Sequence, residues 1–268
     1  MKFNRPKQVK QLSTAKSPQQ MFGAACKEYL KTFKKIKPEN VYCVSVMPCL
    51  AKKYECAVPE VNDVKKDVKD VDASLTVREF HRMMKVANIK PENLKPVPFD
   101  TPMGEATGAA HIFGATGGVM EAALRTAYFV VCKKNPPADL FKNVRGMDGW
   151  KEATFKLKGT PIRVAVASGL VNAEKLLTAI DNGEVEYDFV EIMTCPGGCA
   201  GGGGQPIKDG VEMAKVRGDH LYFLDKKSKS RFSHENKSLQ EMYKQIFKKP
   251  LSEKSHKLLH TDQSQWSI

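Results

Sequence analysis

The stretch Val185–Pro206 reads VEYDFVEIMTCPGGCAGGGGQP and joins an apolar run to a glycine-rich loop that contains two cysteines. Its first part, Val185–Met193, is short and rich in β-branched and aromatic residues, which predicts a buried strand. The loop that follows places Cys195 and Cys199 four residues apart, around a proline and two glycines. We therefore expect a strand that ends at a functional loop.

A second apolar run, Val41–Met47 (VYCVSVM), also predicts a strand, and Met47-Pro48-Cys49 follows at its end. Further strands are expected at 71–75 and 162–167, helices at 18–33, 76–86, 119–131, 173–180 and 238–247, and a polar, basic linker from about residue 219 to the last helix. Strands that alternate with helices predict an α/β fold with mostly parallel sheets flanked by helices. In such sheets ligands bind beyond the carboxyl ends of the strands, where both cysteine motifs lie.

Composition limits the choice of partner and compartment. The 43 basic and 30 acidic residues give a formal charge of +13, which indicates an anionic partner or else a solvated lysine-rich surface. The chain has no aromatic-rich RNA-binding signature and no zinc-finger pattern, so we expect an acidic protein rather than nucleic acid. It has no run long and apolar enough for a membrane span and no visible signal peptide, so we expect no membrane partner. Seven cysteines, an odd and sparse set, favour a reducing compartment.

The paired cysteines carry the strongest chemical signal. Two thiolates at this spacing suit a soft metal or an iron–sulfur cluster, and backbone without side chains can approach a bulky inorganic group closely. The alternative is a flexible glycine loop with two incidental buried cysteines. A structural zinc site is disfavoured because no second closely spaced Cys/His pair accompanies this one. The segment around Cys49 is weaker taken alone, although Lys52 could place an ammonium group beside an anionic ligand.

Together the two motifs resemble the second and third signatures of the iron-only (FeFe) hydrogenases, MPCxxKxxE and CxGGCxxGGGQP. The resemblance extends over nearly the whole chain, to segments at 12–20, 103–105, 112–125, 142–149 and 233–236. It implies a hydrogenase that interconverts protons and molecular hydrogen. The charge of +13 further predicts that ferredoxin, an acidic electron carrier, is its partner. The resemblance also implies an H-cluster, in which a 4Fe–4S cubane is joined through a cysteine sulfur to a 2Fe subcluster that carries CO and CN ligands.

The resemblance assigns roles to individual residues. It makes Cys49, Cys195 and Cys199 ligands of the cubane, with Cys199 bridging to the 2Fe subcluster, and it directs Lys52 to a cyanide. The catalytic set further contains Met47 and Met193, packed against the 2Fe subcluster, and Ser13 of the proton-transfer chain. Around the cofactor the resemblance places Pro48, Glu55, Phe113, Gly114, Gly198 and Gln205. Glu55 is expected to orient the loop, and Phe113 and Gly114 to form the pocket wall.

The chain departs from the family pattern at its N-terminal end, and Cys26, Cys43, Cys56 and Cys132 match no ligand position of the family. A first signature resembling TSCCPGW would lie upstream of residue 1, so we expect an incomplete enzyme: residues 1–218 as a large-subunit domain truncated at its N-terminus and 219–268 as a small-subunit-like segment. The compartment is expected to be cytoplasmic or hydrogenosomal. Two alternatives stay open at this point. One is a relative of the cytosolic iron–sulfur assembly and prelamin-associated proteins, without hydrogen chemistry, and the other is a non-catalytic basic binding protein.

Overall fold

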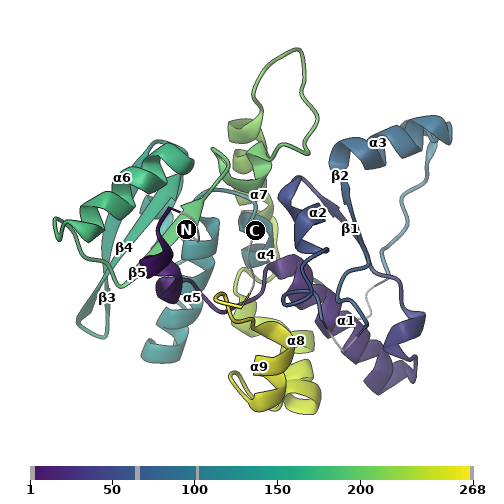
Figure 1. Cartoon of the computed structure of the whole chain (residues 1–268), viewed down its shortest axis with the longest axis horizontal. Helices are drawn as coiled ribbons and strands as arrows, with labels where there is room; N and C mark the ends of the chain where they lie inside the picture. The colour runs from purple at the N-terminus through teal and green to yellow at the C-terminus, as the bar shows by residue number, and fades with distance from the viewer. Residues whose placement is uncertain (1–3, 64–66, 101–102, 266–268) are drawn as a thin grey trace. The chain divides into compact units, whose positions relative to one another are not determined.

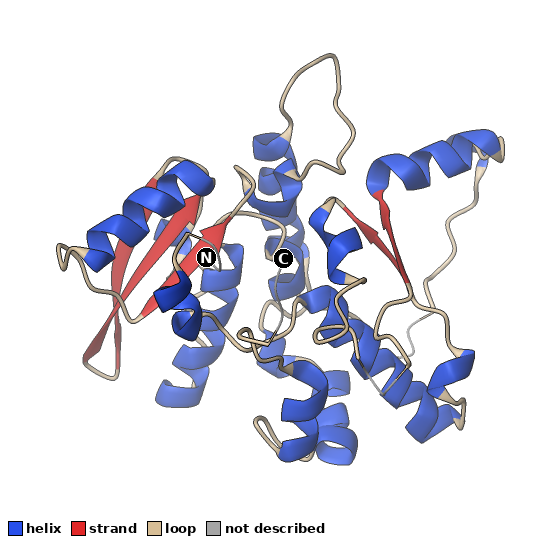
Figure 2. Cartoon of the chain, viewed as in Figure 1, coloured by secondary structure: helices blue, strands red, loops and turns tan. Residues whose placement is uncertain are grey.

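The computed structural model describes residues 4–63, 67–100 and 103–265, which fall into two compact units. Unit 1 comprises 1–104 and 237–268, and unit 2 comprises 105–236. Each unit combines strands with helices, as Figures 1 and 2 show. Among the described residues, two strand pairings are parallel and one is antiparallel. The predicted α/β fold with mostly parallel pairing is therefore confirmed.

Unit 1 is built around a two-stranded parallel sheet and a helical core. Its helices and strands are α1 (Pro18–Lys34), β1 (Val44–Met47), α2 (Ala51–Glu55), β2 (Ala73–Thr76), α3 (Val77–Val86), α8 (Lys237–Met242), the π-helix Tyr243–Phe247 and α9 (Glu253–Leu259). The start of α1 is capped by Ser17, whose side chain accepts from Gln20 N, and Pro18 occupies the first helical position. The start of α3 carries a full capping box between Thr76 and Glu79.

Contacts between segments far apart in the sequence hold unit 1 together. Ala24 of α1 packs in one apolar cluster with Phe247 and Leu258 from the C-terminal helices. The buried Lys16 side chain donates to Asp70 at 2.9 Å and to Asp63 at 2.8 Å, so its charge is paired where it is hidden from water. The C-terminal segment therefore completes the core of the N-terminal one.

Unit 2 is a three-stranded sheet with helices on both faces. Its helices and strands are α4 (Gly108–Ile112), α5 (Gly118–Cys132), β3 (Trp150–Leu157), β4 (Thr160–Ser168), α6 (Leu170–Asp181), β5 (Phe189–Met193) and α7 (Ala214–Lys227). The strand order is β3-β4-β5, with β3 antiparallel to β4 and β5 parallel to it. Val164 and Val166 of β4 pack in the cluster that contains α5 residues, and Ala165 and Ala167 pack in the cluster that contains α6 residues. This alternation is why the central strand is apolar on both faces.

One expectation for this unit needs correction, and one strand was not predicted. The predicted linker from residue 219 is wrong over its first part, because Ala214–Lys227 forms α7. The apolar pattern of this helix is weak. Besides Leu221 and Tyr222, it is anchored by the fully buried carboxylate of Asp225 and by the close approach of Gly108, where a Cβ would lie 2.3 Å from that carboxylate. Strand β3 was not predicted. It pairs with β4 through a two-residue turn at Lys158 and Gly159, both of which have positive φ.

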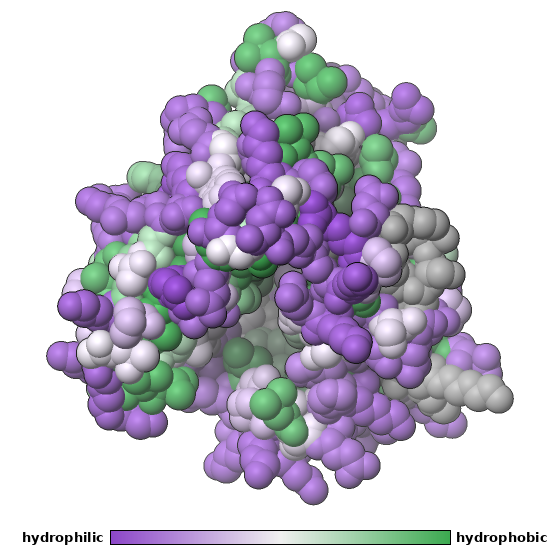
Figure 3. Space-filling model, turned by 60° about the vertical axis from the view of Figure 1, so that its left-hand side comes forward, coloured by the Kyte–Doolittle hydropathy of each residue, from purple (hydrophilic) through white to green (hydrophobic). Residues whose placement is uncertain are grey.

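The face of the molecule that Figure 3 shows is mostly polar. Hydrophilic side chains cover most of the face in Figure 3, and apolar side chains appear there in small separate groups. No helix in the described ranges combines the length and the apolar character that crossing a lipid bilayer would require. Scattered apolar residues on a surface are ordinary and mark no binding site by themselves.

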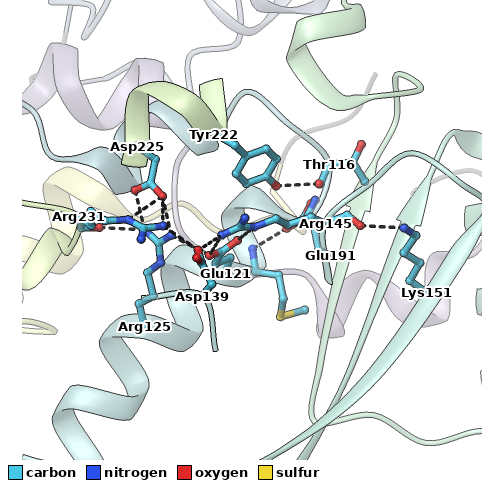
Figure 4. A network of polar contacts seen from close by, with 12 residues as sticks. Thr116, Glu121, Arg125, Asp139, Arg145, Lys151, Glu191, Tyr222, Asp225 and Arg231 are labelled. Carbon is cyan, nitrogen blue, oxygen red and sulfur yellow. Dashed lines mark hydrogen bonds and ion pairs between the residues drawn. The ribbon is translucent and has the colours of Figure 1, made fainter. Parts of the chain in front are cut away.

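A buried ion network joins α5 and α7 to the loops around them (Figure 4). Arg125 is 1% exposed and donates to both carboxylate oxygens of Asp225, at 2.9 and 2.8 Å, and to Glu121 at 2.7 Å. Arg231 also donates to Asp225, and Arg145 to Glu121. Burial alone would raise the pKa of Asp225, but hydrogen bonds from Arg125 and Arg231 outweigh it and hold the pKa below its usual value.

We predict that Asp225→Asn destabilises the protein strongly, because it leaves two guanidinium groups short of a partner in a buried place. Breaking a buried ion pair typically costs about 3–5 kcal/mol. The matched control is Asp219→Asn on the same helix, where the carboxylate pairs with Lys215 and is 68% exposed. That variant should stay within about 0.5 kcal/mol of the parent. Urea unfolding followed by circular dichroism measures both, and equal midpoints for the two variants would contradict the prediction.

Candidate metal centre

The first cysteine motif lies at the carboxyl end of β1, as predicted. Met47 is the last residue of the strand, and Pro48 and Cys49 lead from it into the short helix α2. All three are half-buried, so the thiol of Cys49 lies between the core and the surface of unit 1. A proline at this point adds no backbone N–H that would need a partner.

Lys52 and Glu55 face each other across one turn of α2. Lys52 Nζ donates to Glu55 Oε2 at 2.5 Å, and the other carboxylate oxygen, Oε1, accepts from Ser17 Oγ at 2.5 Å. Gln19 Nε2 also reaches the carbonyl of Lys52, at 3.4 Å. The lysine three residues after the cysteine is thus held by its own helix and by the start of α1. Ser13 lies on an exposed turn nearby in sequence, where its Oγ accepts from Ala15 N at 3.2 Å.

The second motif lies at the carboxyl end of β5, two residues beyond Met193. The backbone of its loop is held at several points. Gly197 N donates to Ser168 Oγ at 3.1 Å, Gly198 N donates to the Cys195 carbonyl at 2.9 Å, and Ala200 N donates to the Gly114 carbonyl at 2.8 Å. The loop is therefore fixed by the protein's own hydrogen bonds.

Two glycines of this loop are required by its conformation. Gly197 and Gly198 have φ of +80° and +77°, which side chains rarely tolerate. A Cβ on Gly198 would also lie 3.0 Å from the carbonyl oxygen of Gly114. The cysteine loop and the segment Gly114–Thr116 can therefore pack backbone against backbone only when this residue is glycine.

The wall residues Phe113 and Gly114 follow α4 directly. Phe113 is half-buried and packs beside the buried cluster of α4 and α5 that contains Ile112. Gly114 supplies the carbonyl that binds the cysteine loop, and a Cβ there would lie 2.7 Å from Leu221 Cδ1. Gln205 lies at the far end of the glycine run, where its N–H donates to the Gly202 carbonyl at 2.9 Å.

Two residues that support the loop from neighbouring elements, Glu191 and Arg217, were not predicted. Glu191 is 6% exposed and accepts from Gly117 N at 2.7 Å and Met120 N at 2.6 Å. Burial raises its pKa, and the two backbone hydrogen bonds oppose that rise. Arg217 of α7 donates to the carbonyls of Ala200 and Pro206. Glu191 could have been suspected as the charged residue inside an apolar strand, whereas nothing in the sequence marks Arg217.

The predicted site residues divide between the two units. Unit 1 carries Ser13, Met47, Pro48, Cys49, Lys52 and Glu55, and unit 2 carries Phe113, Gly114, Met193, Cys195, Gly198, Cys199 and Gln205. No group of three or more His, Cys, Asp or Glu side chains within the described ranges forms a ready metal site. The meeting of all three cysteines at one cluster therefore stays a prediction.

The residues of each motif fit an iron–sulfur ligand set. None of the seven cysteines is in a disulfide, Cys199 is exposed and Cys195 is half-buried, so both thiols of the glycine loop are within reach of a ligand. Thiolate sulfur is the donor that holds such clusters, and the glycine backbone between the two thiols leaves space for a bulky group. The remaining cysteines lie elsewhere: Cys56 is buried and accepts from Gln19 Nε2 at 3.3 Å.

Comparison with known proteins places the chain among the hydrogenases. The sequence model of the iron only hydrogenase large subunit, C-terminal domain, matches residues 1–203, and that of the iron hydrogenase small subunit matches residues 211–264. The NADP-reducing hydrogenase subunit HndD of Solidesulfovibrio fructosivorans is 50% identical over 250 residues, covering 93% of this chain and 42% of HndD. The cytosolic iron-sulfur assembly component 3 of Mus musculus is 30% identical, over 93% of this chain and 53% of that protein.

The fold agrees with these matches. The structure of the apo [FeFe]-hydrogenase HydA1 from Chlamydomonas reinhardtii superposes with a TM-score of 0.81 at 38% identity, covering 96% of this chain and 71% of that one. The chain spans about half the length of the curated relatives it matches. Since the large-subunit model covers most of the sequence, the chain belongs to the iron-only hydrogenase family.

Proposed function

We propose that this chain forms part of the catalytic domain of a hydrogenase that interconverts protons, electrons and molecular hydrogen at an H-cluster. The observation that carries the proposal is the Cys195–Cys199 loop, fixed by backbone hydrogen bonds at the end of β5, in a chain that matches the family over residues 1–203 and 211–264. We assign residues 1–218 to the large-subunit domain and 219–268 to the small-subunit-like segment. We propose that an additional segment, which carries the first signature of the family, completes the enzyme.

The proposed site uses the chain's own groups in distinct ways. Cys49, Cys195 and Cys199 would hold the 4Fe–4S cubane, and the 2Fe subcluster would supply the redox chemistry of hydrogen. Lys52 brings an ammonium group that can donate to an anionic ligand, and Glu55 holds it in place at 2.5 Å.

The other proposed residues shape and serve the same site. Met47 and Met193 would offer polarizable side chains to the 2Fe subcluster. Ser13 would pass protons by its exposed hydroxyl. Pro48, Phe113, Gly114, Gly198 and Gln205 would form the walls that exclude water.

The assembly-type relative is the second candidate, and it is favoured less because its 30% identity compares with 50% for HndD. A non-catalytic basic protein is the third. Iron bound after anaerobic reconstitution would distinguish the non-catalytic protein, which binds none, from the hydrogenase and the assembly-type relative. Infrared bands of metal-bound CO and CN then separate a hydrogenase from an assembly protein.

We predict that hydrogen evolution requires Cys199. The chain is expressed together with the upstream segment that the family resemblance predicts and is loaded anaerobically with the cofactor. Cys199→Ala should then abolish hydrogen evolution from reduced methyl viologen, because the cubane would lose a thiolate. The control is Cys132→Ala, at the end of α5 in the same unit, which should keep the parental rate. Equal rates for the parent and Cys199→Ala would refute the proposed function.

We also predict that Cys49 and Cys199 approach within roughly 10 Å, since one cubane cannot span a wider gap between its thiolates. In a chain with Cys26, Cys43, Cys56 and Cys132 replaced by serine, a thiol-specific cross-linker of that span should join Cys49 to Cys195 or Cys199. Peptide mass spectrometry identifies the product. Cross-linking confined to Cys195 and Cys199 would show that the two motifs do not share a cluster.

The electron partner is proposed to be an acidic ferredoxin. The formal charge of +13 favours an encounter with an acidic carrier, because complementary charge raises the association rate more than it tightens the complex. We predict that the rate of hydrogen evolution with reduced ferredoxin falls steeply as salt is raised from about 0.01 to 0.3 M, where the screening length shortens several-fold. Methyl viologen, a small cation, serves as the control donor. A ferredoxin rate that does not respond to salt would leave the lysines as a solubilising surface only.

A further inference from the structure

Glu55 is held by two donors that come from different elements. Ser17 Oγ, at the start of α1, donates to one carboxylate oxygen, and Lys52 Nζ donates to the other. The Lys52 and Glu55 side chains are 24% and 22% exposed, so water reaches the pair in part. A hydrogen-bonded path therefore runs from the start of α1 through Glu55 to Lys52.

Ser17 makes a second contact with its single hydroxyl. The oxygen accepts from Gln20 N at 3.4 Å and so caps α1. Its one hydrogen is directed to Glu55, which a hydroxyl can do while its lone pairs accept elsewhere. These two roles of Ser17 can be separated by substitution. Capping α1 requires a hydrogen-bond acceptor or a glycine, whereas binding Glu55 requires the hydroxyl as a donor.

Packing does not confine the Glu55 carboxylate. A cavity of about 400 Å³ in unit 1 is lined by Ser17, Glu55, Tyr54 and Lys16, among others. Lys16 is itself engaged by Asp63 and Asp70 and is not directed to Glu55. With open space beside it, the carboxylate is oriented by its hydrogen bonds and not by neighbouring side chains.

We propose that Ser17 is a positioning residue for Lys52. By holding one oxygen of Glu55, it presents the other oxygen to the ammonium group and fixes Lys52 in one orientation. Without the Ser17 hydroxyl, the Glu55 carboxylate rotates toward the cavity, and its ion pair with Lys52 weakens. The consequence for the site rests on the proposed function, since it is Lys52 that is proposed to meet an anionic ligand of the cofactor.

The test measures the reactivity of Lys52 in the cofactor-free chain. Trace acetylation with isotope-labelled acetic anhydride, followed by peptide fragmentation, gives the labelling rate of each lysine. In Ser17→Ala and Ser17→Gly, Lys52 should react roughly two- to fivefold faster, the range expected for weakening a partly exposed ion pair. Ser17→Thr keeps the hydroxyl and should match the parent.

Two controls separate positioning from a merely structural role. Lys53 has its own partners, Ser74 and Glu79, and should keep its rate in every variant. Ser252→Ala removes a serine cap from α9 in the same unit without touching Glu55, and should leave Lys52 unchanged. Glycine is a far better cap than alanine, so a capping effect would be restored in Ser17→Gly. Parental Lys52 reactivity in Ser17→Gly, or an equal rise in Ser252→Ala, overturns the proposal.

A second measurement keeps this inference distinct from the proposed function. In the completed enzyme loaded with cofactor, Ser17→Gly should shift or broaden an infrared cyanide band. Faster labelling of Lys52 with an unchanged band would uphold the role of Ser17 and refute the contact between Lys52 and cyanide. Unchanged labelling overturns the role of Ser17, whatever the band does.

Discussion

The carboxylate of Glu191 joins β5, the strand that leads into the cysteine loop of unit 2, to the start of α5. The first backbone N–H groups of any helix lack partners within the helix. At the start of α5 the cap residue is Gly117, which has no side chain to accept from them. Glu191, on β5, serves as the acceptor instead, and the backbone N–H groups of Gly117 and Met120 donate to its carboxylate. Its negative charge lies where the helix dipole favours one.

This one contact fixes two segments of the site. Glu191 lies on β5, two residues before Met193, so it ties the end of the strand to the start of α5. The same contact holds Gly117, and through it the segment that begins at Gly114. The loop then closes onto that segment through Ala200 N and the Gly114 carbonyl. The buried ion network extends this arrangement, because Glu121, on the first turns of α5, binds Arg125 and Arg145.

The sequence predicts well what is local and apolar. The strands that end at Met47 and Met193 have strong apolar patterns, and the cap of α1 is visible in the order Ser17-Pro18. The positions of both cysteine motifs at strand ends followed from these patterns. Helix α7 was missed because its anchor, Asp225, looks solvent-exposed until Arg125, a hundred residues earlier, is placed beside it. The hydrogen bond from Ser17 to Glu55 could not be predicted for the same reason, because its two residues are 38 positions apart in the sequence.

Each cysteine motif is held by hydrogen bonds within the polypeptide. In the cysteine loop the N–H groups of Gly197, Gly198 and Ala200 are all bonded within the protein, and these bonds hold the conformation that presents Cys195 and Cys199. In unit 1 the Ser17–Glu55–Lys52 path fixes a cation three residues beyond Cys49 in the same way. Ligands held by such surrounding hydrogen bonds lose little freedom when they bind. Each of the two motifs is therefore ordered by hydrogen bonds within its own unit.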